Sequence, residues 1–336
     1  MTELINHAAA DATSDPADLS GLALVGEAEG LSSRSRSPVR LALRRFRRNG
    51  VSMTALVILL VIMFCCLFPD VPARVGEIDR LAITPTVRPN SPPSSGAWFG
   101  TDNLNHDVFS RIWYGGRVSM LIGLSVAVIA CTVGTLIGAV AGYVGGKVDD
   151  VLMRITDVFL AFPVLVLLLI LRNLLTEVPF VSTLMGDKNS VRFIVMLLVF
   201  LGWMPVARIV RGEVMSLKQR EFVEAARALG ASGPRIVFRH LIPNSLGPIM
   251  VSLSLAVVTA ILAESTLSFF GYGPQRGNGQ ATWGLLIAEA PDSIIPGYWW
   301  KVLFPCLALV ITIVCINFIG DGLRDAFDPK GNRERA

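Results

Sequence analysis

Two polar side chains lie inside apolar runs of the sequence and are the first candidates for chemistry. Glu264 lies within residues 246 to 270, and Asn317 lies within residues 302 to 320. Such groups often line the path of a solute, but they also hydrogen-bond to each other or to backbone carbonyls. For Glu264 we keep a place on a solute pathway and a structural role equally open, and for Asn317 we favour the structural role.

The types and spacing of residues that make a catalytic or nucleotide-binding site are missing from the sequence. Lys147 follows a glycine, but Val148 stands where a phosphate-binding loop needs Ser or Thr. Pro234 stands where a nucleophile elbow around Ser232 needs glycine, and Asp321 lacks the first glycine of an aspartyl-protease pattern. The three histidines are far apart in the chain: His7, His106 and His240. We therefore expect no catalytic residue, no metal site and no cofactor bound by this chain.

The charged stretch from 221 to 244 is the third candidate, and its pattern predicts a surface that meets protein. Four residues recur at helical spacing and form one apolar stripe: Phe222, Ala225, Ala226 and Leu229. Three charged residues point elsewhere: Glu221, Glu224 and Arg227. The alanines make a low ridge that fits a protein groove, whereas a helix lying at the lipid headgroups favours larger apolar residues. Periodicity alone supports docking into a partner and packing on the chain's own helices equally.

Turn residues divide this stretch into two short helices. Gly230 is the expected end of the first helix, because glycine takes the left-handed conformation after a helix without steric cost. Ser232 is placed to cap a second helix, and Pro234 suits its first turn. That helix is expected to end at Pro243.

The rest of the chain is apolar enough to hold these candidates in a membrane. Of its 336 residues, 52% are hydrophobic and 17% are charged, and the mean hydropathy is +0.58. Crossing a bilayer takes roughly 20 mostly apolar residues. Six runs are that long: 51 to 69, 118 to 143, 152 to 172, 191 to 210, 246 to 270 and 302 to 320. We predict an all-α integral membrane protein with six transmembrane helices, the first being an anchor rather than a cleaved signal.

Basic residues predict the orientation of these runs. With the N-terminus inside, the cytoplasmic segments hold 20 of the 30 Lys and Arg residues, as the positive-inside rule requires. Both termini are therefore predicted to be cytoplasmic. Several aromatic residues fall at the outer ends of the runs, where they suit the interface: Trp98, Trp113, Tyr114, Trp283, Tyr298, Trp299 and Trp300.

These patterns divide the chain into five segments: 1 to 40, 41 to 69, 70 to 117, 118 to 320 and 321 to 336. The first is an acidic, disordered cytoplasmic tail, and the second holds a basic segment and the first span. The third is an external loop whose prolines oppose regular structure up to residue 96, followed by an interfacial helix around Val108 and Ile112. The fourth is a five-helix core that includes the loop 211 to 244, and the fifth is a cytoplasmic tail.

Short patterns within the runs predict local contacts. Three glycines share one face of the second run, where another helix can approach closely: Gly134, Gly138 and Gly142. Arg154 and Asp157 are spaced to form an ion pair on one helix, and Pro163 and Pro205 are expected to kink their helices. Five cysteines in apolar runs are expected to be buried thiols: Cys65, Cys66, Cys131, Cys306 and Cys315.

The sequence EAA at 224 to 226, with Gly230 and then HLIP at 240 to 243, resembles the EAA loop of permease subunits in ABC importers. The order of four further stretches resembles the dipeptide and oligopeptide permease family, and in particular its second, C-type permease subunit. These stretches are FGTDNLNHDVFSRIWYGGRVSM, GYVGGKVDDVLMRITDVFLAFP, ILAESTLSFFGYG and NFIGDGLRDAFDP. The likeness covers nearly all of residues 40 to 330. One departure is that Asn105 and His106 stand where the family usually has Gly-Arg.

The resemblance implies the type I ABC importer permease fold and a mechanical role. In such importers the EAA loop supplies a coupling helix that sits in a cleft of a cytoplasmic ATPase, and closure of the ATPase dimer around ATP switches the membrane subunits between two states. On this basis Glu224 and Arg227 would contact the ATPase, Ala225 and Ala226 would form the packing ridge, and Gly230 would make the turn. Phe222 and Leu229 complete the expected coupling surface.

The resemblance also implies partners and cargo. The expected partners are a second permease subunit, two ATPase subunits or domains that bind ATP and Mg²⁺, an extracytoplasmic substrate-binding protein and membrane lipid, without nucleic acid, in a bacterial inner membrane. Peptides are the favoured cargo, and nickel, opines or another small solute are the alternatives. A self-contained secondary transporter is the alternative from another class, although no internal repeat supports it. An intramembrane hydrolase would need paired catalytic residues that the sequence lacks.

Overall fold

The structure, a computed structural model, describes residues 38–75, 88–180, 183, 190–274, 282–289 and 297–327. The regular structure of these residues is helical apart from two isolated bridges, Ser94 to Ala97 and Thr101 to Asp107. The chain divides into two units, 1–45 and 46–336. The helices described here belong to the second unit, except that residues 38–45 of the first helix, Pro38–Arg48, belong to the first unit. The disordered tail predicted up to residue 40 falls almost wholly outside the described residues.

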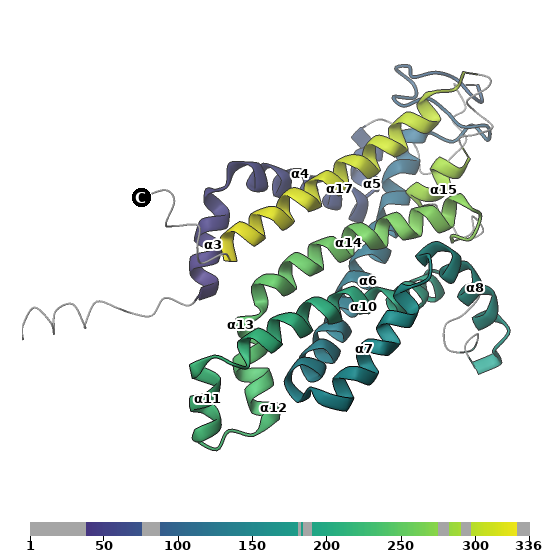
Figure 1. Cartoon of the computed structure of the whole chain (residues 1–336). Coiled ribbons are helices and arrows are strands. Elements are labelled where there is room, and N and C mark those ends of the chain that lie inside the picture. The colour runs from purple at the N-terminus through teal and green to yellow at the C-terminus, as the bar shows by residue number, and fades with distance from the viewer. Residues whose placement is uncertain are drawn as a thin grey trace, which may run out of the picture. The chain divides into compact units, whose positions relative to one another are not determined.

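Among the described residues, five helices are long and apolar enough to cross a membrane: α4 (Gly50–Leu67), α6 (Val108–Val144), α10 (Val191–Leu217), α14 (Leu246–Phe269) and α17 (Trp300–Phe327). α6 packs against α10 and α14, α14 packs against α17, and α17 packs against α4, so that the helices lie side by side (Figure 1). Their apolar runs agree with five of the six predicted spans. The sixth candidate is a bent pair of helices.

This bent pair consists of α7 (Gly146–Leu160) and α8 (Val164–Thr176), which meet at 97°. The predicted span from 152 to 172 is therefore broken into two helices, and the kink expected at Pro163 is a sharp bend between them. Pro163 occupies the N-cap position of α8, and because proline lacks an amide proton and disfavours helix in the residue before it, the helix stops instead of bending. Pro205, in contrast, remains inside α10.

The ends of three elements differ from the sequence prediction. α6 begins at Val108 and continues through the membrane-spanning run, so there is no separate interfacial helix within the described residues. Its N-cap is Asp107, whose carboxylate accepts a hydrogen bond from the amide of Ser110 at 2.6 Å. A short helix, α5 (Asp70–Val75), forms in the external segment despite its proline. α17 continues to Phe327, so part of the predicted C-terminal tail is helical.

Shorter helices occupy the two ends of the bundle. One end carries α11 (Glu221–Ala228), α12 (Gly233–Ile236), the π-helix η1 (Val237–Leu241) and α13 (Ile242–Asn244). The other end carries α15 (Trp283–Ala288), which the sequence did not predict. Figure 1 shows α11 and α12 far from α15 along the long helices. A basic helix, α3 (Pro38–Arg48), precedes α4 in the sequence.

The predicted glycine face of α6 is confirmed. A Cβ atom added at Gly134 would lie 2.5 Å from the carbonyl oxygen of Trp203, and one at Gly142 would lie 2.8 Å from that of Arg211. At Gly138 an added Cβ would collide with the carbonyl oxygen of Ala207. The backbones of α6 and α10 are therefore in direct contact over about two turns, and the two helices form one closely packed pair.

Several side-chain predictions are corrected by the packing. Trp283 and Trp300 are core residues rather than interface residues, and their indole nitrogens donate to the carbonyl oxygens of Ile112 at 2.9 Å and Thr101 at 3.2 Å. Asp157 pairs with Arg208 of α10 and not with Arg154 of its own helix. Of the five cysteines only three are buried, Cys66, Cys131 and Cys315, whereas two are partly exposed, Cys65 and Cys306.

Candidate functional site

The EAA segment, residues 220 to 244, forms two surfaces. One surface is turned to the bundle and the other is exposed. Val223 of α11 is fully buried, at 0% exposure, and Ala226 packs partly buried beside it. Phe222 is 40% exposed and Leu229 is 89% exposed, and Ala225 between them is also exposed. The predicted stripe is therefore split, because one of its alanines packs inward and the other three members face outward. We call Phe222, Ala225 and Leu229 the exposed set, because their side chains face away from the bundle.

Gly230 has the predicted role at the end of α11. Its φ is +79°, and the amide of Ala231 donates to the carbonyl oxygen of Ala226 at 3.0 Å. This is the hydrogen-bonding pattern that closes a helix through a left-handed residue. An added Cβ at Gly230 would meet nothing within 4 Å, so the requirement for glycine comes from the backbone conformation rather than from crowding.

The second half of the segment is helical past the position where it was expected to stop. Ser232 occupies the N-cap of α12, as predicted, although its side chain makes no capping bond. Pro243 does not end the helix: the five residues of η1 precede it, and α13 carries the chain into α14. A π-turn widens the backbone and so accommodates a residue without an amide proton. The side-chain amide of Asn244 then donates to the carbonyl oxygen of His240 at 2.5 Å.

An apolar cluster holds the segment to α6 and α10. Val223 and Ile236 are fully buried in it together with Ala139 of α6 and Val214 of α10. Lys218, the C-cap of α10, donates to the carbonyl oxygen of Gly142 at 2.9 Å, near the end of α6. The segment is therefore fixed to the closely packed helix pair and presents its other face outward.

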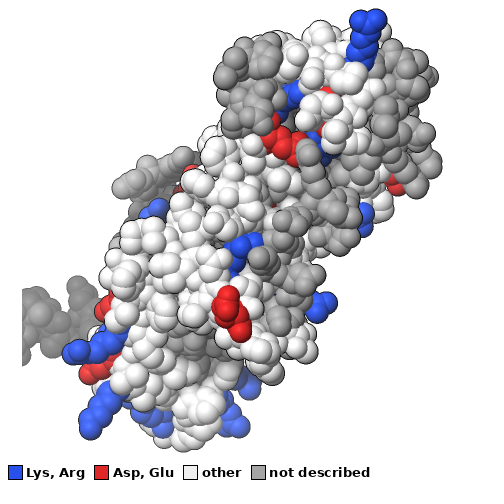
Figure 2. Space-filling model, turned by 90° about the vertical axis from the view of Figure 1, so that its right-hand side faces the viewer, with Lys and Arg blue, Asp and Glu red and all other residues white. Residues whose placement is uncertain are grey.

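The exposed face is charged and basic. Glu221 and Glu224 are exposed in the first turn of α11, where acidic groups favour the helix dipole. Four exposed arginines belong to the segment: Arg220, Arg227, Arg235 and Arg239. Figure 2 shows Lys and Arg gathered at the lower end of the molecule, where Figure 1 places α11 and α12. An exposed helix with small, apolar and charged residues at one end of a bundle has the composition of a docking surface.

Glu264 lies in a buried network of hydroxyl groups. Its carboxylate accepts hydrogen bonds from Ser119 of α6 at 3.2 Å and Ser268 of α14 at 2.6 Å. Thr282, the N-cap of α15, donates to Ser268 at 3.2 Å, and the amide of Trp283 donates to Ser119 at 3.1 Å. The carboxylate is fully buried within the chain. These contacts support the structural interpretation of Glu264, which joins three helices.

Asn317 lies on the exposed face of α17 beside Phe318. There it is placed to meet lipid or another chain.

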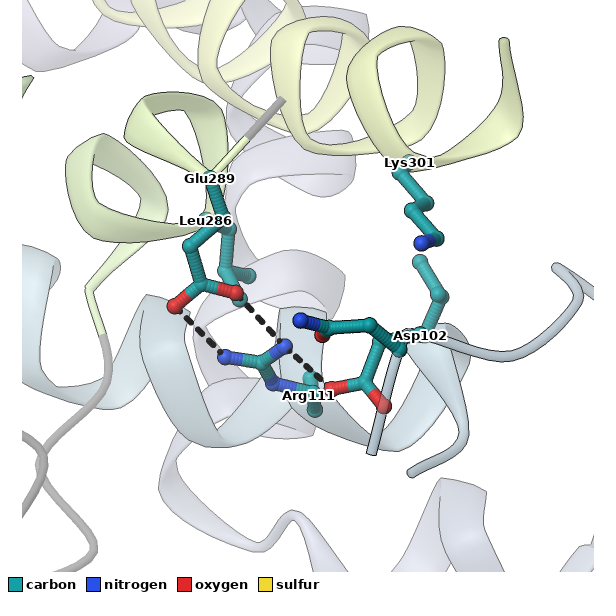
Figure 3. A pocket seen from close by; sticks show the side chains of 7 residues that line it. Asp102, Arg111, Leu286, Glu289 and Lys301 are labelled. Atoms are coloured by element: carbon teal, nitrogen blue, oxygen red, sulfur yellow. Dashed lines mark hydrogen bonds and ion pairs between the residues drawn. The ribbon is translucent and has the colours of Figure 1, made fainter. Parts of the chain in front are cut away.

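A second polar cluster lies at the opposite end of the bundle and was missed by the sequence analysis. Arg111 of α6 donates to Asp102 at 2.6 Å and forms two bonds with Glu289, the C-cap of α15, at 2.9 and 3.2 Å (Figure 3). Arg111 and Asp102 are buried. Lys301 lines the same small cavity, of about 20 Å³, which has room for about one water. Because Arg111 and Glu289 are far apart in the sequence, no local spacing predicts the pair.

Family models match most of the chain. Residues 134–333 match the family described as binding-protein-dependent transport system inner membrane component, and residues 37–93 match the N-terminal TM domain of oligopeptide transport permease C. The chain belongs to the first of these families. As a member of the binding-protein-dependent transport family it is a multi-pass membrane component of a transporter, and not itself an enzyme.

Curated relatives of this membrane component carry peptide-permease names. The dipeptide transport system permease protein DppC of Bacillus subtilis is 38% identical over 91% of this chain and 90% of its own length. The oligopeptide permease OppC of the same organism is 36% identical, over 91% of this chain and 94% of its own length. OppC of Haemophilus influenzae is 37% identical over 98% of both chains. A solved structure of the MetNI methionine ABC transporter matches with a TM-score of 0.48 and 18% identity, over 62% of this chain and 94% of that chain.

The departure at Asn105 and His106 has a structural account in this family member. Asn105 has a φ of +63°, in the left-handed region that glycine and asparagine adopt most readily. His106 faces Asp102, with Nδ1 3.1 Å from the carboxylate. Burial raises the pKa of the neighbouring Asp107, although its bonds from Ser110 oppose this shift. Asn105 therefore makes a left-handed turn, and His106 stands beside the Arg111 cluster through Asp102.

Proposed function

We propose that this chain is one of two permease subunits of an ATP-driven peptide importer, and that α11 is the helix that docks into an ATPase subunit. The observation that carries the proposal is the division of α11 into a buried base and an exposed face. Val223 anchors the helix at 0% exposure, while Leu229 is 89% exposed. Large apolar side chains exposed together with charged ones mark protein interaction sites.

The exposed set agrees with the roles implied by the EAA resemblance. Ala225 presents a small side chain that allows close approach, with Phe222 and Leu229 on either side as apolar contacts. Glu224 and Arg227 are exposed and available for polar contacts with the partner. Ala226 takes a different role, since it packs toward the bundle and helps to hold α11 in place.

Peptide cargo is supported by the names of the relatives, which are dipeptide and oligopeptide permeases. The proposed complex contains this chain, a second permease subunit, two ATPase subunits that bind ATP and Mg²⁺, and an extracytoplasmic binding protein. Each permease supplies half of the passage. Import of nickel, opines or another small solute by the same architecture is the alternative, because the binding protein makes the selection.

The proposed orientation places both termini and the EAA segment in the cytoplasm of a bacterial cell. It is supported by the excess of Lys and Arg in the segments assigned inside, and by the basic end that carries α11 and α12 (Figure 2). The Arg111 cluster is then on the outer side.

Cysteine labelling tests this orientation. Two variants, Trp98→Cys and Leu229→Cys, are made separately in a chain whose own five cysteines are replaced. A membrane-impermeant maleimide should label the thiol introduced by Trp98→Cys in intact spheroplasts. It should label the thiol introduced by Leu229→Cys only after lysis. The reverse pattern would place the EAA segment outside the cell and contradict the proposal.

Co-purification tests the docking proposal. The affinity-tagged chain, extracted from its own cells, should carry ATPase subunits with it. Ala225→Trp should reduce their recovery about tenfold or more, because the bulky ring blocks close approach at an exposed position of α11. Phe238→Ala is the matched control, since Phe238 is 61% exposed but lies in η1, outside α11. Unchanged recovery with Ala225→Trp would contradict the docking surface.

Transport by the purified chain alone would contradict the importer proposal as a whole. If proteoliposomes that contain only this chain accumulate solute against a gradient, the chain is a self-contained secondary transporter. The cargo is tested on the partner binding protein by competition between di- and tripeptides, nickel and opines. Displacement by nickel or opines alone would leave the importer architecture but replace peptide as the cargo.

A further inference from the structure

The start of α7 is held to the bundle by one charged side chain, whereas Phe159 and Leu160 at its far end pack against the apolar core. The only buried side chains of α7 are Asp149 in the first turn and Thr156. The hydroxyl of Thr156 donates to a carbonyl oxygen of its own helix, that of Met153. Four apolar side chains of α7 are exposed: Val148, Val151, Ile155 and Val158. Packing in the described chain therefore does little to fix the start of α7, and the attachment depends on Asp149.

The partner of Asp149 is Arg211 of α10. Arg211 binds the carboxylate through two nitrogens, with Nε to Oδ1 and a terminal nitrogen to Oδ2 at 2.5 Å. The side chains are 9% exposed for Asp149 and 32% exposed for Arg211. A bidentate arginine–carboxylate pair fixes geometry as well as charge. Arg211 thereby covers the carboxylate of Asp149, which is largely shielded from water while the pair is formed.

Arg211 lies on the part of the molecule to which the EAA segment is fixed. A Cβ at Gly142 of α6 would lie 2.8 Å from the carbonyl oxygen of Arg211, so α6 and α10 touch at this level. Lys218 joins the same helices at their ends, and Val223 of α11 packs into the apolar cluster between them. A displacement of α11 is therefore passed to the backbone that carries Arg211.

The far end of α7 borders an apolar groove of about 480 Å³. Phe159 and Leu160 from α7 and Val164 from α8 line one part of it, and residues of α10 and α14 such as Leu201 and Ala256 line the rest. A movement of α7 against α10 changes the width of this groove. The bend of 97° between α7 and α8 gives the pair a natural hinge at residues 161 to 163.

We propose that the Arg211–Asp149 pair is the joint through which movement of the EAA segment is passed from the α6–α10 pair to α7. Both are positioning residues, because they act through the helix that they hold. The inference rests on the proposed function, since it needs an ATPase that moves α11. It assigns to these residues the coupling between the two sides of the membrane, which neither the EAA resemblance nor the family match assigns to them.

The chain offers a matched comparison on the same two helices. Arg208 of α10, one turn before Arg211, pairs with Asp157 of α7. These side chains are 45% and 61% exposed. Exposed ion pairs contribute little, because water solvates both charges when the pair is open. If any α7–α10 ion pair sufficed, substitutions in both pairs would lower coupling equally, whereas our proposal requires a loss only for substitutions in the Arg211–Asp149 pair.

The test uses the whole importer, purified through a tag on this chain and reconstituted in proteoliposomes. The readout is the rate of ATP hydrolysis with the binding protein divided by the rate without it. The binding protein is purified with its own ligand and added at the outer side. Asp149→Asn and Arg211→Gln should each lower this ratio by about fivefold or more, the size of a typical coupling energy. Asp157→Asn and Arg208→Gln should leave it within about twofold.

Two further variants separate coupling from folding. Arg211→Lys keeps the charge but loses the two parallel bonds, and we expect an assembled complex with a lowered ratio. The reversed pair, Asp149→Arg with Arg211→Asp, should recover a large part of the ratio that either single change loses. Failure of the Arg211→Lys complex to assemble would overturn the proposal in favour of a purely structural role.

The outcomes also distinguish this inference from the proposed function. If the wild-type chain purifies without an ATPase, the proposed function fails first. If the wild-type complex is stimulated by its binding protein and Asp149→Asn leaves that stimulation unchanged, the joint is refuted while the importer stands. Equal losses in the Arg208–Asp157 variants would likewise refute the special role of the buried pair.

Discussion

The ring of Tyr143, near the end of α6, lies against Gly233 at the start of α12. A Cβ added at Gly233 would lie 3.1 Å from Cε1 of the ring, which is tighter than ordinary van der Waals contact. A membrane-spanning helix thus touches the EAA segment directly, with no side chain between them on the α12 side. Together with buried Val223, this contact makes the segment a continuation of the α6–α10 pair.

Gly230→Val should abolish transport while the chain still inserts into the membrane. The φ of +79° at this position costs a β-branched residue about 1–3 kcal/mol, and no neighbouring atom lies within 4 Å to add steric clash. Gly230→Asn is the control, because asparagine tolerates this conformation, and it should transport normally. The measurement is uptake, normalised to the amount of chain in isolated membranes. Normal uptake by Gly230→Val would count against the turn.

Substitutions at Leu229 and Val223 should have different effects, the first on binding of the ATPase and the second on stability of the chain. Leu229→Ala removes an exposed side chain, so the free energy of unfolding should change by under about 0.5 kcal/mol. The affinity for the ATPase should fall, by about tenfold for each 1.4 kcal/mol of binding free energy lost at the interface. Val223→Ala opens a cavity under α11 and should lower stability by about 1–3 kcal/mol. Thermal unfolding of the chain and titrated pull-down of the ATPase measure the two effects. Equal behaviour of the variants would contradict the division of α11 into two faces.

Glu264→Gln should preserve both stability and transport, because the amide keeps the shape of the carboxyl group and an acceptor oxygen for Ser119 or Ser268. Glu264→Leu leaves those hydroxyls without their acceptor, at about 1–3 kcal/mol for each buried group left unsatisfied, and its melting temperature should fall. Thermal melting and uptake are measured on both variants. Loss of uptake in a fully stable Glu264→Gln protein would instead place the negative charge on the solute pathway.

Arg111→Gln should destabilise the end of the bundle that carries α15. The substitution leaves Asp102 and Glu289 without their shared cation, and breaking a buried ion pair costs about 3–5 kcal/mol. Arg117→Gln is the matched control, since Arg117 is exposed on the same helix, and its effect should be under about 0.5 kcal/mol. Thermal unfolding of the purified chain decides between them. A small effect at Arg111 would show that the cluster adds little to stability.

Local conformational signals allowed parts of this structure to be predicted correctly. The apolar runs marked five spans because a helix that crosses a bilayer must be apolar over its whole length. Gly230 marked the end of α11 because the left-handed conformation favours glycine wherever it occurs. The glycines of α6 marked a face of close approach, although they did not show that the neighbour is α10.

Other features needed the folded chain. Periodicity grouped Phe222, Ala225, Ala226 and Leu229 on one side of a helix, but burial of Val223 decided which side meets the bundle. Pro163 signalled a local disturbance, but the size of the bend, 97°, is visible only in the folded chain. α15 was missed because six residues are too few to show a helical period.

The sequence by itself determined the membrane-spanning character of the chain, its helical class, its family resemblance and the turn at Gly230, since each of these depends on residues close together in the chain. The tertiary structure alone decided that Asp157 pairs with Arg208 rather than Arg154, that Asp149 pairs with Arg211, and that Arg111 reaches Glu289. Charged side chains select their partners by distance and burial in space, and spacing along one helix does not contain that information.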